Sequence, residues 1–423
     1  MHLIKFIIFI SFSFITNYIK YLFGSINSSE FIKNIIGKIG EYNVVFLKLL
    51  QWICVKKDSV YFNKESIDFI NKYTNKTPYT NEDIDWKLIA ETLCYSNFNK
   101  DILTFDSFEP INSGTISLVF KGKLNDKPIA IKILRKNILN NINIGINLLE
   151  SIFYILNLFK LFNDLHFNRL LENTKPEIYS QIDFESEINN LIKFKSNFSK
   201  NKVVVIPGVY CHYTVKLKNI IVMDWIDGYN INFLDPKDCK NACNFFIKYI
   251  FSSYIYKGIV HGDLHQGNVI FIKDKINDQD VFKIGLIDFG TILELDTDEI
   301  NLSCVFIDSF FNRDLDKLQE YILNYKNCIF EDTQESNVLK VITEMNDLKE
   351  KNILFIQNNY VTDDIVLFLK IIKNNNCIIK NKIYRIIMSL IPLTYIIENI
   401  CEKGEHVMLI NEQFAKIKNK FAI

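Results

Sequence analysis

The stretch HGDLHQGNVIF, residues 261–271, places two of the chain's six histidines around one aspartate. Asn268 follows Asp263 by five residues, and an apolar run that predicts a strand comes directly after it. A carboxylate and a carboxamide at this spacing, on a loop closed by a strand, can reach one metal-bound phosphate together. The alternative interpretation is an ordinary polar turn between a helix and a strand.

Three more side chains fall in the order that phosphoryl transfer requires. Lys132 ends the run IAIK, where its ammonium can reach the α- and β-phosphates, and Glu187 in DFESEINNLIKF can pair with it. Asp288 in GLIDFG follows an apolar strand, where its carboxylate can bind Mg²⁺. Taken singly, Lys132 is compatible with a surface lysine and Asp288 with a turn. Together with Asp263 orienting the acceptor and Asn268 holding the metal, they predict a catalytic site.

Two further segments are candidates for nucleotide contacts. INSGTIS, residues 111–117, precedes a predicted strand and can wrap phosphates with backbone N–H groups, although one glycine is a weak signal. In VMDWIDG, Met223, Asp224 and Trp225 close a strand and form the expected connection between lobes, whose backbone would meet adenine. We therefore expect the chain to bind ATP or ADP with Mg²⁺.

The pattern of the chain predicts an α+β protein with a bilobal, protein-kinase-like fold. TISLVFKGKL and IAIKIL, joined by an Asn-Asp turn, predict a hairpin, and the apolar LLESIFYILNLFKLF predicts a buried helix. The chain is mostly helical after Phe233. We expect a hydrophobic segment at 1–24, a helical extension at 25–100, a first lobe with a helical insertion at 101–225 and a helical second lobe at 226–423.

Composition excludes several classes of protein. Hydrophobic residues make up 48% and aromatic residues 14%, as in a packed globular protein. Lys plus Arg equals Asp plus Glu, 49 each, so nothing indicates nucleic acid as a partner. The nine cysteines form no C-x-x-C pair, which favours a reducing compartment and argues against a disulfide framework and a zinc site. Cys239 and Cys243 are expected to be buried thiols.

The first residues form an apolar segment that is uninterrupted from Phe6 to Ile15. This run is short for a spanning helix, which needs about 20 apolar residues. It resembles the core of a signal peptide but offers no small-residue cleavage site. A contact with a membrane surface and a docked, buried helix both fit it.

These motifs together resemble the UbiB-type atypical kinases, also called aarF-domain-containing kinases, from about residue 40 onward. FLKLLQW resembles the family's K-x-G-Q element, with Lys48 and Gln51 kept and Leu50 in place of the glycine. QIDFESEINN resembles its E-x-D-F-x-x-E-x-x-N helix, with Gln181 in place of the first glutamate. In place of the family's Ala-rich nucleotide loop, the chain has Asn112, Ser113, Gly114 and Thr115.

The resemblance implies an ATPase or kinase linked to isoprenoid-lipid metabolism, with a membrane surface as a further partner. It also implies that the helix with Lys48 and Gln51 packs over the acceptor site, with both side chains toward the nucleotide phosphates. Three positions apart, these two side chains share one face of a helix. Leu50 and Gln181 alter this regulatory layer, whereas the residues for phosphate chemistry are intact. The sequence specifies no protein partner.

Two other functions remain open. A small-molecule phosphotransferase of the aminoglycoside or choline kinase type also carries His-Gly-Asp and a distant aspartate, and there Asp263 would deprotonate a hydroxyl group. A pseudokinase that binds nucleotide as a scaffold would explain Leu50 and Gln181. The IDFESE helix and the Phe-Gly after Asp288 argue against the first, and the retained Lys132 argues against the second.

Overall fold

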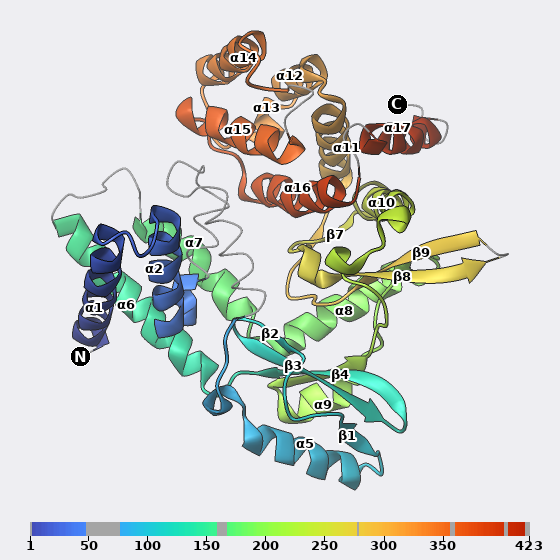
Figure 1. Cartoon of the computed structure of the whole chain (residues 1–423). Helices are drawn as coiled ribbons and strands as arrows, with labels where there is room; N and C mark the ends of the chain where they lie inside the picture. The colour runs from blue at the N-terminus through green and yellow to red at the C-terminus, as the bar shows by residue number, and fades with distance from the viewer. Residues whose placement is uncertain are drawn as a thin grey trace. The chain divides into compact units, whose positions relative to one another are not determined.

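The computed structural model describes residues 2–47, 77–158, 167–276, 279–355, 360–401 and 405–418 (Figure 1). The chain divides into two compact units. Unit 1 consists of Met1–Ile188 and Gly208–Trp225, and unit 2 of Asn189–Pro207 and Ile226–Ile423. Both contain helices and a sheet, so the predicted α+β class is confirmed.

Unit 1 is built on an antiparallel sheet with the strand order β1-β3-β4-β6, and β2 pairs with the β3 strand. The predicted hairpin is confirmed as β3 and β4. Asn125 and Asp126 join these strands with φ angles of 48° and 66°. Positive φ at both positions gives the turn a twist that matches the strands, and Asn and Asp tolerate it. The strands are β1 (Leu103–Phe105), β2 (Asn112–Ser113), β3 (Ser117–Leu124), β4 (Lys127–Leu134) and β6 (Ile220–Asp224).

The core of this sheet is apolar, and it forms where α5 (Trp86–Phe98) and α9 (Cys211–Leu217) pack on the strands. Phe120, Ile131 and Val222 contribute side chains that are completely buried. From Ile129 onward every residue of β4 is buried. A charged side chain on this part of the strand is shielded from water and therefore needs a partner of opposite charge.

The other helices of unit 1 include the N-terminal helices and the helix predicted from LLESIFYILNLFKLF, which is buried on one face only, since Tyr154 is 67% exposed. α1 packs against α2 and α6, and α6 buries Ile142, Leu149 and Phe153. Lys48, Leu50 and Gln51 lie outside the described residues. These helices are α1 (His2–Leu22), α2 (Ser28–Tyr42), α6 (Ile138–Leu158), α7 (Phe167–Ser180) and α8 (Phe184–Phe198), which continues into unit 2.

Unit 2 contains two small sheets and a set of helices. One sheet has the order β5-β9-β8, and the other pairs β7 with β10. The strands are β5 (Val204–Val205), β7 (Ile259–His261), β8 (Val269–Ile276), β9 (Gln279–Leu286) and β10 (Ile292–Glu294). The main helices are α10 (Pro236–Phe251), α11 (Thr297–Asn312), α12 (Leu315–Asn324), α14 (Glu335–Glu350), α15 (Val361–Asn374), α16 (Asn381–Ile400) and α17 (Glu405–Lys418).

The cysteine prediction is wrong for one pair. Cys243 on α10 and Cys401 after α16 form a disulfide, with their Cα atoms 6.4 Å apart. The two residues are 158 positions apart, and only the packing of α10 against α16 brings them together, so short-range spacing could not reveal them. The reducing compartment stays a prediction. Cys239 is a free thiol, partly and not fully buried.

Candidate active site

The predicted ion pair between Lys132 and Glu187 is present in unit 1. Asp183 accepts a hydrogen bond from the backbone N–H of Ser186, which starts α8 and places Glu187 in its first turn. Lys132 Nζ lies 2.7 and 2.9 Å from the two carboxylate oxygens of Glu187. The side chains are only 8% and 6% exposed. Removing either partner would leave a buried charge, which typically costs about 3–5 kcal/mol.

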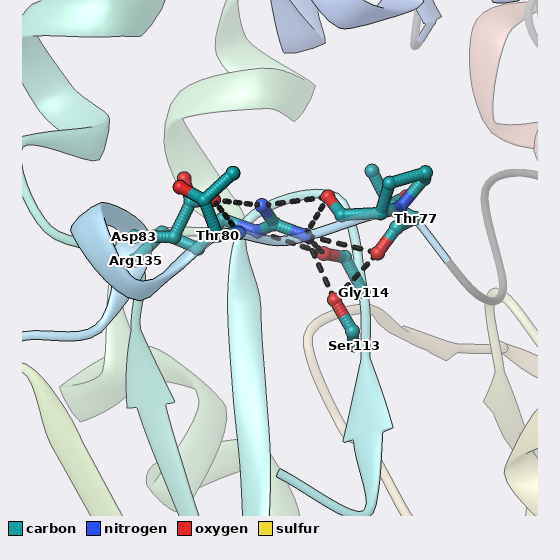
Figure 2. Close-up of polar contacts among 7 residues, drawn as sticks. Thr77, Thr80, Asp83, Ser113, Gly114 and Arg135 are labelled. Carbon is teal, nitrogen blue, oxygen red and sulfur yellow. Dashed lines mark hydrogen bonds and ion pairs between the residues drawn. The ribbon is translucent and has the colours of Figure 1, made fainter. Parts of the chain in front are cut away.

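Arg135, one residue beyond β4, organises the candidate nucleotide loop at residues 112–115. It is 7% exposed, and its Nη2 donates hydrogen bonds to Ser113 Oγ at 2.8 Å and to the Gly114 carbonyl at 2.9 Å. Figure 2 shows the guanidinium between this loop and a second segment of unit 1. The contacts on that second side are the carbonyl oxygens of Thr77 and Pro78 and the carboxylate of Asp83.

The loop itself is held by further bonds. Ser113 N donates to the Asn112 side chain, and Gly114 N donates to the Ser117 carbonyl at 2.9 Å. These two N–H groups, which the sequence assigned to phosphate, are therefore engaged inside the loop. Ser113 and Thr115 are buried, whereas Asn112 is exposed. The loop is a preformed turn whose exposed polar side chain is Asn112.

The segment predicted to meet adenine is also tied to its own unit. Asp224 N donates to the Gly208 carbonyl at 2.8 Å, and Trp225 N donates to the Pro128 carbonyl at 3.1 Å. The Asp224 carboxylate accepts a hydrogen bond from Gly208 N. Met223 is buried in the ladder between β4 and β6, opposite Ala130. An adenine contact at this segment would therefore have to use carbonyl groups or replace these bonds.

In unit 2, two glycines shape the candidate catalytic loop at residues 261–268. Gly258 has a φ angle of 58° and ends the helical segment before β7, a conformation that glycine adopts without strain. At Gly262 a Cβ atom would lie 2.5 Å from the Thr291 side chain, so only glycine fits. Asp263, the next residue, lies at the surface and is exposed.

The two histidines of the loop have structural roles. His261 is 2% exposed, and its Nε2–H donates to the Asp288 carbonyl. Its Nδ1 accepts the backbone N–H of Asp263 at 3.3 Å. Burial lowers the pKa of His261, so the ring is neutral near pH 7, as this tautomer requires. His265 Nδ1 accepts the N–H of Gly267 and caps the short turn that carries Asn268.

The predicted metal ligands suit a hard cation. Asn268 Nδ2 donates to the Asp263 carbonyl at 2.9 Å, so the amide oxygen is the atom left to face a cation. Asp288 has a φ angle of 79°, an uncommon conformation for a residue with a side chain and one that occurs at functional sites. Its Oδ1 accepts the N–H of Gly290. Oxygen donors of these two kinds are what Mg²⁺ prefers.

Sequence reasoning missed three positioning residues. Asn190 Nδ2 donates to the Phe289 carbonyl at 3.0 Å and fixes the turn after Asp288. His261 connects the backbones of Asp263 and Asp288, and Arg135 holds the nucleotide loop. Asn190 was visible as part of the helix motif and His261 as part of HGD, but their partners were not. The basic residue that directly follows the predicted strand was the only signal for Arg135.

Two expectations for the residues around the K-x-G-Q-like element and Gln181 remain predictions. Lys48 and Gln51 fall in residues 48–76, outside the described part of the chain, so their direction is not defined. Gln181, the departure from the family's glutamate, lies just before α8. Its Oε1 is buried and makes no hydrogen bond within the described residues.

Comparison with known proteins identifies the family. The model of the ABC1 atypical kinase-like domain matches residues 82–322, more than half of the 423 residues. "Probable protein kinase UbiB" of Blochmanniella pennsylvanica is 30% identical over 224 residues, which cover 51% of this chain and 40% of that protein. "AarF domain-containing kinase 1" of Drosophila melanogaster is 24% identical over 269 residues, covering 59% of this chain and 50% of that protein. The chain thus spans half or less of these relatives' length.

Solved structures give a looser likeness. The complex of Rv3197 with erythromycin from Mycobacterium tuberculosis is 16% identical and matches with a TM-score of 0.45, over 70% of this chain and 74% of that one. The assignment therefore depends on the family model and on the motifs in their places: the Lys132–Glu187 pair on β4 and α8, and the Asp263, Asn268 and Asp288 loops of unit 2. The chain belongs to the ABC1 atypical kinase-like family and has its kinase-like fold.

Proposed function

We propose that this chain is a UbiB-type atypical kinase or ATPase that binds Mg-ATP and transfers or hydrolyses its γ-phosphate. The buried ion pair of Lys132 and Glu187 carries the proposal. Lys132 is the charged residue on the buried part of β4, and its Nζ lies 2.7 Å from the Glu187 carboxylate. A buried ion pair adds little net stability, so its presence here supports a role in binding phosphate, the task of this lysine in kinases. The family match supports the same chemistry.

Each side chain has a defined task in this proposal. Lys132 binds the α- and β-phosphates, and Glu187 fixes the position of its ammonium group. Asp288 and the amide oxygen of Asn268 hold Mg²⁺, which neutralises phosphate charge when bound. Asp263, exposed on its loop, orients the hydroxyl group or water that receives the phosphate. His261 keeps the Asp263 and Asp288 backbones in register and carries no proton to the substrate.

The acceptor we propose is water or an isoprenoid lipid of quinone metabolism. The resemblance to UbiB-type proteins supports this, because their K-x-G-Q segment covers the place of a protein substrate. Lys48 and Gln51 supply the matching residues here. A protein acceptor would require this segment to move away.

The test is magnesium-dependent ATP turnover by the purified full-length chain, with and without quinone-precursor lipids. Calorimetry with Asp288→Asn should show loss of magnesium-dependent ATP affinity while circular dichroism stays unchanged. Unchanged Mg-ATP affinity in that variant would remove Asp288 from the site. Panels of small alcohols and of folded proteins as acceptors then separate the lipid enzyme from a choline-kinase-like enzyme and from a protein kinase.

A nucleotide-binding scaffold is the second candidate, and Gln181 favours it. An amide stands where the family has a carboxylate, and its oxygen is buried without a hydrogen bond in the described residues. The scaffold predicts that the unmodified chain binds Mg-ATP without hydrolysing it. If Gln181→Glu then restores ATP turnover, the glutamine at this position is the cause of the lost activity. Turnover by the unmodified chain would exclude the scaffold.

A further inference from the structure

Helix α1 exposes a broad apolar arc, and the residues that it buries fully are polar. Its two buried residues are Ser13 and Asn17. At about 100° per residue, the exposed apolar side chains occupy an arc of roughly 200° around the helix axis. They are Ile4, Ile7, Ile8, Phe12, Phe14, Ile15, Tyr18, Ile19, Tyr21 and Leu22, followed by Phe23 at 82% exposure. A surface helix of a soluble protein has the opposite arrangement.

The polar face of α1 is covered by α2, which lies beside it (Figure 1). Asn34 Nδ2 on α2 donates to Asn17 Oδ1 at 3.0 Å, and Asn17 Nδ2 donates to the Ser13 carbonyl at 2.8 Å. Ring contacts extend the pairing along the helix, from Phe6 with Tyr42 at 5.0 Å to Tyr21 on α1 with a ring of α2 at 6.0 Å. Packing against α2 therefore gives Asn17 a polar partner and places Phe31 against one edge of the arc, formed by Phe14, Tyr18 and Tyr21. The rest of the arc lies outside this contact.

We propose that the exposed arc of α1 binds the surface of a lipid bilayer, with α2 on the water side. A convex arc of about 200° is wider than the stripe a helix normally presents to one protein groove, but fluid acyl chains can follow it. No charged residue lies between Lys5 and Lys20, and these two lysines flank the apolar run as they would near anionic headgroups. Tyr18 and Tyr21 add aromatic side chains of the kind enriched at the membrane–water interface.

The packing of α2 favours an interfacial helix over a spanning one. The 21 residues of α1 extend over about 31 Å, which would be long enough to cross the hydrocarbon core. A spanning α1 would carry α2 into the core, and α2 exposes Glu30, Lys38 and Glu41. Burying these charges in hydrocarbon is expensive, whereas an α1 lying in the interface leaves them in water. This proposal does not depend on the nucleotide chemistry.

The first test measures binding of the full-length chain to phosphatidylcholine vesicles, with and without phosphatidylglycerol, by flotation. The double variant Ile8→Ser, Ile15→Ser should bind at least roughly tenfold more weakly, because it removes apolar groups from the arc. The matched control is Phe98→Ser with Val215→Ser, which removes exposed apolar side chains, 83% and 68% exposed, elsewhere on unit 1. It should bind like the unmodified chain. Equal loss in both variants, or no vesicle binding by the unmodified chain, would overturn the proposal.

Analytical ultracentrifugation without lipid tests the competing occupant, a second copy of the chain. Under the proposal, the unmodified chain and the Ile8→Ser, Ile15→Ser variant sediment alike. Dissociation of an oligomer by this variant would assign the arc to self-association and overturn the lipid assignment.

The second test measures depth. Ile8, Ile15 and Leu22 are seven positions apart and share one face. A genetically encoded nitroxide placed at each in turn should report the same shallow depth in vesicles. A label at Ile15 that is much deeper than the other two would show a spanning helix and overturn the interfacial geometry.

Discussion

Lys132 and Arg135 are two buried basic residues near the end of β4, and their charges are compensated by different kinds of partner. Lys132 is paired with the carboxylate of Glu187, with Nζ 2.7 Å from Oε1. Arg135 mainly faces backbone carbonyls, those of Thr77, Pro78 and Gly114. The ammonium of a lysine that is paired with a carboxylate can also bind an anionic ligand. A planar guanidinium that is bonded to several carbonyls instead fixes the path of the backbone. The same strand end thus supplies one group for the proposed phosphate chemistry and one that holds the loop in place.

The largest effect on stability should come from removing one partner of the Lys132–Glu187 ion pair. Glu187→Leu should lower the free energy of unfolding of unit 1 by about 3–5 kcal/mol, because it removes the carboxylate that is paired with the buried Lys132. The double variant Lys132→Met, Glu187→Leu should recover most of that loss, since both charges are gone. Urea unfolding followed by circular dichroism measures both. If the double variant is no more stable than the single one, the pair is not the dominant partner of either charge.

A smaller loss is expected for Arg135→Lys, which keeps the charge but removes the planar fork. Leaving carbonyls of the loop without a donor should cost about 1–3 kcal/mol. Amide hydrogen exchange at residues 112–117 should speed up by at least tenfold. Asp83→Asn is the matched control, because Asp83 is 28% exposed and its ion pair with Arg135 is peripheral to the loop. Equal exchange rates in Arg135→Lys and the unmodified chain would show that the loop holds its shape alone.

The smallest effect concerns Glu398 in unit 2, a carboxylate held by backbone and hydroxyl donors. It accepts the N–H of Val361 and the Thr362 hydroxyl. Burial raises its pKa from 4.5 to about 7. A raised carboxylate pKa gives stability that is complete below pH 4.5 and is lost as the pH rises through about 7.

Glu398→Gln, which stays neutral, should therefore raise the melting temperature of unit 2 at pH 8 by a few degrees. The difference from the unmodified chain should shrink towards pH 5. Differential scanning calorimetry at both pH values checks this. A stabilisation that is the same at pH 5 and pH 8 would mean that the charge of Glu398 is not its cause.

Most of the fold's elements could be read from the sequence because they depend on local patterns. The β3–β4 hairpin has its alternation and its Asn125–Asp126 turn in adjacent residues, and the strand after Asn268 is an apolar run. The Lys132–Glu187 pair was predictable only through the order of motifs, since 55 residues separate the partners. The short strands β1, β2 and β10 were not found, because runs of two or three residues carry no period.

What the sequence could not indicate depends on contacts that residue types and their spacing do not specify. Neither the disulfide of Cys243 and Cys401 nor the bond from His261 to the Asp288 carbonyl leaves a trace in residue spacing. The same holds for the amides of Gly114 and Trp225, which are bonded inside unit 1 although their residue types gave no sign of it. Residue types at a site were thus easier to predict than the hydrogen bonds that orient them.

The carbonyl contacts of Arg135 have a consequence for how this loop can change in evolution. Every amino acid supplies the same backbone oxygen, so the acceptors at 77, 78 and 114 survive almost any substitution at those positions. Only Ser113 offers a side-chain acceptor to the guanidinium among the loop residues shown in Figure 2. The position of the loop therefore depends little on its amino-acid sequence. Other residues could therefore replace Asn-Ser-Gly-Thr at 112–115 while Arg135 still binds the backbone of the turn.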